Sequence, residues 1–224
     1  MTNIVRNLNL IRNNVKLTAQ KYKRDFNEIT LVAVSKSRSI EAIKDAVQCG
    51  QKDFGENRVQ EAIVKIKELA PYNLTWHYLG RIQSNKTKLI AENFSWVHSL
   101  TKFKHAAYLN QYRPINLPLL NVCIQINISE ETSKDGIDPT ELVDLSTAIA
   151  TLPRLKLRGL MAIPAPHKDF AIQLATFQKL ASLAKPNQDL SMGMSNDYVA
   201  AIAAGATIIR VGTAIFKKAM NNEE

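Results

Sequence analysis

The sequence predicts an α/β protein, a single (β/α)8 TIM-type barrel with an extra N-terminal helix. Eight short apolar segments alternate with segments whose apolar residues recur at helical spacing. The 224 residues suit one domain spanning 1–224, because α/β barrels reach about 250 residues as one unit. The alternative is a doubly wound open sheet. Such a sheet usually carries a glycine-rich turn after its first strand, whereas Ser35-Lys36-Ser37-Arg38 has no glycine.

An extra helix is expected at the N-terminus, followed by the repeating strands and helices. The helix covers Ile4–Tyr22, and the first strand is the β-branched run Thr30–Ser35, typical of a buried parallel strand. Asp138, Pro139 and Glu141 form a strong helix start before the sixth strand. The eight expected strands are residues 30–35, 53–55, 74–79, 94–99, 119–128, 157–163, 190–194 and 207–211.

Composition and charge limit the classes of protein to which this sequence can belong. Hydrophobic residues make up 46% and charged residues 22%, which is ordinary for a globular chain and argues against disorder. The net charge of +9 is spread along helix faces, without the aromatic strands or zinc spacing of nucleic-acid-binding modules. Cys49 and Cys123 form no CxxC pair, so we expect no metal site and no disulfide. No signal peptide and no apolar run of about 20 residues is present, which fits a cytoplasmic protein.

The carboxyl ends of the strands are where a barrel of this type places its functional groups. Lys36 directly follows the first strand, so its amine should lie near the barrel mouth. Desolvation there would lower the pKa of the amine and prepare it for Schiff-base chemistry. The alternative is a lysine that extends to water from a strand end. Trp76, Trp96, His77 and His98 lie within strands and are interpreted as core residues.

The loops after strands seven and eight often form a phosphate site in such barrels. Ser195 is expected to begin a helix, and Gly212 with Thr213 lets main-chain amides approach an anion. The alternative is that Ser195 is only a helix N-cap and that Gly212 only forms a turn. Together with Lys36, these residues predict a ligand that is an aldehyde and carries a phosphate, as pyridoxal 5'-phosphate (PLP) does.

Arg210 lies on the last strand and points toward the same region. A buried arginine is costly unless it is paired. It could contact the pyridine nitrogen of PLP, or it could form a structural ion pair. A cation at that nitrogen would keep it unprotonated and weaken the ring as an electron sink.

Several motifs, in order along nearly the whole chain, resemble those of the PLP-binding, PLP-homeostasis family, whose fold is similar to the barrel domain of alanine racemases. The motifs include Leu31–Lys36, Phe54–Asn57, Trp76–Gly80, Arg158–Pro164 and Ile209–Phe216. The resemblance implies that Lys36 carries the cofactor and Asn57 lines the site near the ring. It also implies that Arg210 faces the pyridine nitrogen and that Ser195, Gly212 and Thr213 bind the phosphate.

The predicted function is therefore PLP binding in intracellular PLP homeostasis, by buffering or delivery that affects amino-acid and keto-acid balance. We expect a monomer without enzymatic activity that hands PLP to apo-enzymes and binds neither nucleic acid nor membrane. A two-base racemase needs a group on each face of its substrate, and little chain follows the eighth strand. One alternative is a minimal PLP-dependent amino-acid racemase or lyase, which a steady-state assay would reveal. The other is a basic nucleic-acid-binding module, which salt-dependent affinity would reveal.

Overall fold

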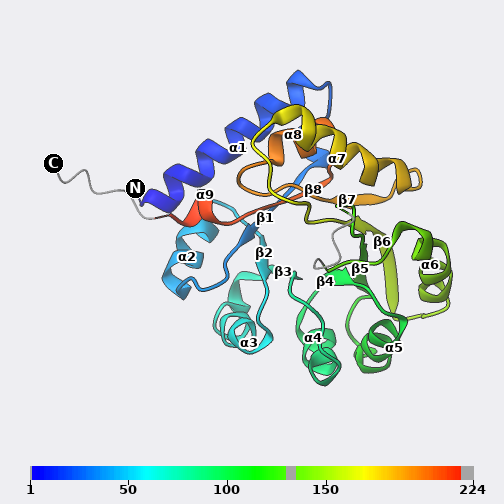
Figure 1. Ribbon diagram of the computed structural model, residues 1–224. Coiled ribbons are helices and arrows are strands. Elements are labelled where there is room, and N and C mark those ends of the chain that lie inside the picture. Colours follow the sequence, from blue (N-terminus) through cyan, green and yellow to red (C-terminus); the bar gives the residue numbers. More distant parts are fainter. Residues whose placement is uncertain (1, 130–134, 218–224) are drawn as a thin grey trace.

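Eight parallel strands form a closed barrel, in the order β1-β2-β3-β4-β5-β6-β7-β8, which confirms the predicted fold class. The computed structural model describes residues 2–129 and 135–217, and Figure 1 shows the strands at the centre of a ring of helices. The strands are Thr30–Val34 (β1), Asp53–Glu56 (β2), Thr75–Tyr78 (β3), Trp96–Leu100 (β4), Leu120–Gln125 (β5), Leu155–Met161 (β6), Asp189–Ser191 (β7) and Ile208–Val211 (β8).

The helices cover the outside of the barrel, and most of them connect one strand to the next (Figure 1). They are Asn3–Lys21 (α1), Ile40–Gln48 (α2), Val59–Glu68 (α3), Thr87–Asn93 (α4), Phe103–Tyr112 (α5), Leu142–Ala150 (α6), Phe170–Leu183 (α7), Tyr198–Ala203 (α8) and Thr213–Phe216 (α9). Four 3-10 turns are also present among the described residues: Phe26–Glu28, Ala70–Tyr72, Ser84–Lys86 and Pro139–Glu141.

Helix α1 is the predicted extra helix, and it packs beside the two short helices α8 and α9 (Figure 1). Leu8, Ile11, Val15 and Ala19 form its buried stripe, at the spacing of one helix face. The side chain of Asn7 donates a hydrogen bond to the Ile215 main-chain oxygen of α9 at 3.0 Å. The helix therefore covers the part of the barrel wall where the connecting helices are shortest.

The predicted helix start at Asp138 is confirmed in detail. The Asp138 carboxylate accepts a hydrogen bond from the Thr140 amide at 2.9 Å, and the Glu141 side chain accepts one from the Asp138 amide at 3.0 Å. This reciprocal pair is a capping box. Its first turn is a 3-10 turn that leads directly into α6.

The fifth strand is shorter than predicted, since β5 ends at Gln125. Ile126 forms an isolated bridge with Ile137, and the Asn127 amide donates to the Ile137 oxygen at 3.0 Å. Ile126 and Asn127 therefore pair with Ile137, and β5 does not extend beyond Gln125 as a regular strand. The apolar, strand-like sequence of residues 119–128 could not reveal this local pairing.

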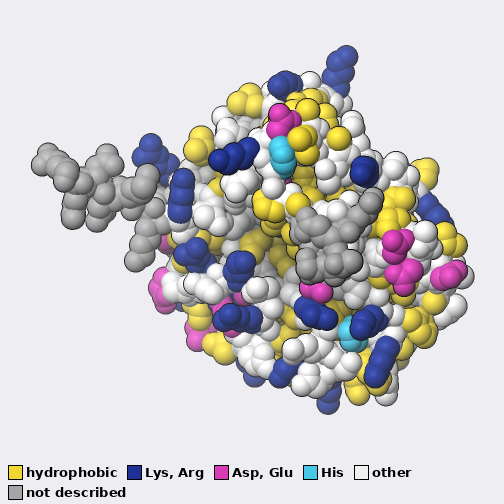
Figure 2. All heavy atoms as spheres, viewed as in Figure 1, with side chains coloured by type: hydrophobic (Ala, Val, Ile, Leu, Met, Phe, Trp, Pro, Cys, Tyr) yellow, Lys and Arg dark blue, Asp and Glu magenta, His cyan; other side chains and the backbone are white. Residues whose placement is uncertain are grey.

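The face of the molecule shown in Figure 2 carries basic side chains that are spread out around it, without forming one patch. This agrees with the scattered charge expected from the sequence. Among the helices that the structure describes, none is both long and apolar enough to span a bilayer.

Candidate functional site

A cavity of about 950 Å³ opens at the carboxyl ends of the strands. Five of the six predicted site residues line it, namely Lys36, Ser195, Arg210, Gly212 and Thr213. They come from the segments after β1, β7 and β8 and from β8 itself. Strand β1 pairs with β8 in parallel, with Val32 opposite Arg210 and Ala33 opposite Val211. This pairing brings the first and last loops of the barrel together at one cavity.

Lys36 lies in the turn after β1, with Ser35 between it and the strand, and its side chain is exposed. The expectation of a desolvated amine was therefore wrong for this structure, because the lysine lies at the open side of the cavity. The next residue, Ser37, has a left-handed backbone with φ of 56°. A non-glycine residue rarely adopts this conformation unless neighbouring contacts hold it.

Contacts from α3 hold the main chain on both sides of Lys36. The Lys65 ammonium donates to the Ser35 main-chain oxygen at 2.8 Å, and the Ser37 amide donates to the Glu61 carboxylate at 2.7 Å. Lys65 also joins that carboxylate at 2.6 Å. One buried lysine and its acidic partner therefore fix the turn that carries Lys36.

The same lysine is paired with a second, fully buried carboxylate. Lys65 Nζ lies 2.8 Å from Glu56 Oε1, and the Ser35 hydroxyl donates to the same oxygen at 2.6 Å. Burial raises the pKa of Glu56, while the hydrogen bonds from Lys65 and Ser35 oppose the shift. This cluster was not predicted from the sequence. The available signal was a charged residue three positions after Ala62 on the buried face of a helix.

The loops after β7 and β8 meet at a hydrogen bond. The Ala214 amide donates to Ser195 Oγ at 3.3 Å. Because this oxygen accepts here, its own proton can be donated to a ligand in the cavity. A side-chain carbon at Gly212 would lie 3.1 Å from the Val34 oxygen, so glycine permits close contact between the last loop and β1. Thr213 is exposed at the start of α9.

Ser195 does not begin a helix, which corrects the prediction. Helix α8 starts at Tyr198, and its N-cap residue is Asp197. The Asp197 carboxylate instead accepts a hydrogen bond from the Met194 amide at 2.5 Å. This local turn competes with helix formation at Ser195 and leaves the serine hydroxyl beside α9. Burial raises the pKa of Asp197, against the hydrogen bond from Met194 and the charge of Arg210.

Arg210 is buried in the barrel interior and reaches the cavity. Its Nη1 donates to Ser191 Oγ at 2.7 Å and its Nη2 donates to the Ala162 oxygen at 2.9 Å. Burial lowers the pKa of Arg210 to about 10, and the charge of Asp197 opposes that shift. Within the described part of the chain, hydrogen bonds to neutral oxygens hold this guanidinium, and no ion pair within 4.0 Å is found for it.

Asn57 is the predicted site residue that the structure does not place at this cavity. It is exposed directly after β2 and is not among the residues that line the cavity. A side-chain carbon at Gly80 would lie 2.2 Å from the Asn57 main-chain oxygen. The glycine therefore lets the loop after β3 pack directly on the backbone of Asn57.

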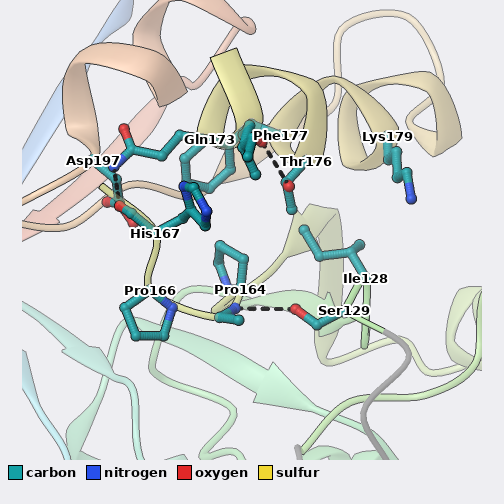
Figure 3. Close-up of a pocket in the computed structure, with 12 residues that line it drawn as sticks. Ile128, Ser129, Pro164, Pro166, His167, Gln173, Thr176, Phe177, Lys179 and Asp197 are labelled. Atoms are coloured by element: carbon teal, nitrogen blue, oxygen red, sulfur yellow. Dashed lines mark hydrogen bonds between the residues drawn. The ribbon is translucent and has the colours of Figure 1, made fainter. Parts of the chain in front are cut away.

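A second, smaller pocket of about 290 Å³ adjoins the cavity and is shown in Figure 3. Helix α7 forms one wall with Gln173 and Phe177, and Ser129 lies on the opposite side (Figure 3). His167 and Asp197 line both spaces. Among the residues that the structure describes, no group of three or more His, Cys, Asp and Glu side chains could hold a metal ion.

Residues 7–219 match the family model for the alanine racemase N-terminal domain. The pyridoxal phosphate homeostasis protein of Escherichia coli K12 is 48% identical over 226 residues, which cover 96% of this chain and 97% of that protein. The protein of the same name from Vibrio cholerae is 47% identical over 227 residues, covering 96% of each chain. This chain belongs to the pyridoxal phosphate homeostasis protein family.

Solved structures of other proteins share the barrel fold of this chain. PipY of Synechococcus elongatus, solved with PLP bound, is 35% identical with a TM-score of 0.82, over 95% of this chain and 99% of that one. Alanine racemase from Corynebacterium glutamicum is 17% identical with a TM-score of 0.64, and the match covers 93% of this chain but 60% of the racemase. At that identity the likeness shows the shared barrel fold alone.

Proposed function

We propose that this protein binds PLP at the cavity of the barrel mouth and serves in PLP homeostasis by holding and releasing the cofactor. The observation that carries the proposal is that Lys36, Arg210 and the loop residues Ser195, Gly212 and Thr213 line one cavity. An amine, a cation and hydroxyl groups around one space fit an aldehyde that carries a phosphate. The names of the relatives and the PLP bound in PipY support the same ligand.

In this proposal Lys36 holds the cofactor through its amine as a Schiff base, with the release of water. The turn fixed by Lys65 and Glu61 presents that amine to the cavity. The hydroxyls of Ser195 and Thr213 bind the phosphate, and Gly212 permits the close approach of the last loop. When bound, PLP supplies an electron-withdrawing ring, and the charge of Arg210 near that ring would disfavour protonation of its nitrogen. The role of Asn57, near the ring, is a proposal that rests on the resemblance.

The biological role that we propose is that of a cytoplasmic carrier without an enzymatic activity of its own. It buffers PLP or delivers it to apo-enzymes, and it acts as a monomer. The matches to proteins named for PLP homeostasis, at 47–48% identity over nearly the whole of each chain, support this role. Size-exclusion chromatography with light scattering tests whether the protein is a monomer in solution.

Borohydride reduction followed by peptide mass mapping tests the ligand and its attachment. Protein loaded with PLP is reduced, and the adduct is expected on Lys36. The matched control is Lys168→Ala, which removes another lysine that lines the same cavity and should leave the adduct in place. Lys36→Ala should abolish the adduct. An adduct that maps to any other lysine in the wild-type protein would contradict the assignment.

A further inference from the structure

Four buried polar side chains form a continuous hydrogen-bonded chain through the barrel interior. His77 Nδ1 on β3 lies 2.9 Å from His98 Nε2 on β4, and His98 Nδ1 lies 2.7 Å from Ser191 Oγ on β7. Ser191 Oγ in turn accepts from Arg210 Nη1 on β8 at 2.7 Å. At the other end, His77 Nε2 lies 3.1 Å from a carboxylate oxygen of Asp53. Both histidines were predicted to be core residues, and the proposed function does not use them.

The charges at the two ends permit one order of protons along this chain. Burial lowers the pKa of His77 and, further, that of His98, so each ring is neutral and carries one N–H. The Asp53 carboxylate can only accept, so His77 donates to it from Nε2. His77 Nδ1 must then accept from His98 Nε2, and His98 Nδ1 must accept from the Ser191 hydroxyl. The Ser191 oxygen is left to accept from Arg210, so every donor points toward Asp53.

This order fixes the orientation of the Arg210 guanidinium. Its Nη1 is held by Ser191, whose own proton is committed to His98, and its Nη2 is held by the Ala162 oxygen. A guanidinium has five N–H donors, so the two bonds leave others for a ligand in the cavity that Arg210 lines. Because it is costly to leave a buried polar group without a hydrogen bond, a network in which every member is hydrogen-bonded is rigid.

We propose that His77, His98 and Ser191 are positioning residues that hold Arg210 toward the bound cofactor. Asp53, which begins β2 at the opposite end of the barrel from the cavity, determines the proton order. The inference deepens the proposed function and rests on it, because it takes the ring of PLP as the group that Arg210 meets. The alternative is a purely structural network, which would affect stability and leave the cofactor environment unchanged.

The proton order can be measured in the protein without cofactor. Imidazole 15N chemical shifts distinguish the two neutral tautomers from each other and from the cation. We expect both His77 and His98 to be neutral and protonated at Nε2 at pH 7.5. A cationic ring, or a ring protonated at Nδ1, would overturn the proposed order.

Ser191→Ala tests whether the chain acts on the cofactor site. Because it removes a hydrogen bond to a charged group, we expect PLP affinity to fall at least about threefold and the visible absorption band of bound PLP to shift. Thr87→Val is the matched control, because it also removes a fully buried hydroxyl, one that donates to the Ser84 oxygen. It should lose comparable stability and keep the wild-type affinity and spectrum. Ser191→Thr restores a hydroxyl and should recover part of the shift.

A second pair of variants covers the case in which Ser191→Ala does not fold. The Asp53 side chain is 30% exposed, so Asp53→Leu is tolerable and removes the acceptor at the far end. It should shift the cofactor band in the same direction, whereas Asp53→Asn keeps an accepting oxygen and should stay near wild type. Wild-type spectra and affinities in both Ser191→Ala and Asp53→Leu, with Lys36 labelled by borohydride, would overturn this inference alone. An unlabelled Lys36 in the wild-type protein would overturn the proposed function and this inference together.

Discussion

The Nζ atom of Lys65 lies 2.8 Å from the main-chain oxygen of Ser35, the residue that precedes Lys36. A helix on the outside of the barrel thereby determines the geometry of the turn that carries the proposed cofactor lysine. The same ammonium is the partner of the buried Glu56 carboxylate. The contact therefore couples the stability of the barrel wall to the position of Lys36.

Replacing Lys65 should reduce both stability and cofactor retention. Lys65→Met leaves Glu56 buried without its cation, which costs about 3–5 kcal/mol of unfolding free energy. Urea denaturation measures that loss, and dialysis against buffer measures PLP retention. Lys67→Met is the control, because Lys67 is exposed on the same helix and should have little effect. Equal stability of the two variants would contradict the role given to Lys65.

Replacing the two hydroxyl residues of the last loops should weaken phosphate recognition selectively. Hydrogen bonds to a charged group contribute about 1.5–3 kcal/mol each, so Ser195→Ala with Thr213→Ala should weaken PLP binding more than tenfold. Binding of pyridoxal, which lacks the phosphate, should change little. Fluorescence titration with both ligands measures the difference, and the control is Ser182→Ala, which removes an exposed hydroxyl of α7. Equal losses for the two ligands would show that these hydroxyls do not bind the phosphate.

Bound PLP should be a poor catalyst in this protein. A cation near the ring nitrogen disfavours its protonation, since a guanidinium stays charged at neutral pH. We expect α-proton exchange of amino acids in deuterated water to remain near the rate of free PLP at equal concentration. Nuclear magnetic resonance of an amino-acid panel measures the rate. Turnover of about one per second or faster, within the usual range of enzymes, would contradict a carrier without enzymatic activity.

The contribution of His77 and His98 to the stability of the protein should fall as the pH is lowered below about 6.5, the ordinary pKa of histidine. Burial lowers the pKa of His77 and His98 in the folded state, so the unfolded chain binds more protons there. Each such proton removes up to about 1.4 kcal/mol of stability per pH unit below that value, and the full contribution is present above it.

His98→Phe isolates this effect. The raised pKa values of Glu56 and Asp197 act in the opposite direction, but they are present in both proteins. The difference between the two curves of unfolding free energy against pH therefore reports the histidine. We expect the variant to be less stable at pH 8, because the Ser191 hydroxyl loses its acceptor, and to show a flatter curve between pH 6.5 and 5. Parallel curves would show that His98 does not titrate on unfolding.

The sequence was sufficient for the fold class and for most of the candidate site. Helical and strand periodicities depend on neighbouring residues, so the eight strands, α1 and the capping box at Asp138 could be predicted locally. The position of Lys36 after β1 and of Gly212 after β8 follows from the rule that parallel strands share one functional rim.

Tertiary structure alone decided which distant side chains meet. Two shorter-range features also differ from the prediction: α8 starts after the turn at Asp197 and not at Ser195, and β5 ends at Gln125, beyond which Ile126 pairs with Ile137. The link between His98 and Ser191 spans 93 residues of sequence, and it exists because strands β4 and β7 face the same interior. Local pattern carries no information on such contacts. They depend on barrel closure and register, which bring residues from distant strands within hydrogen-bonding distance.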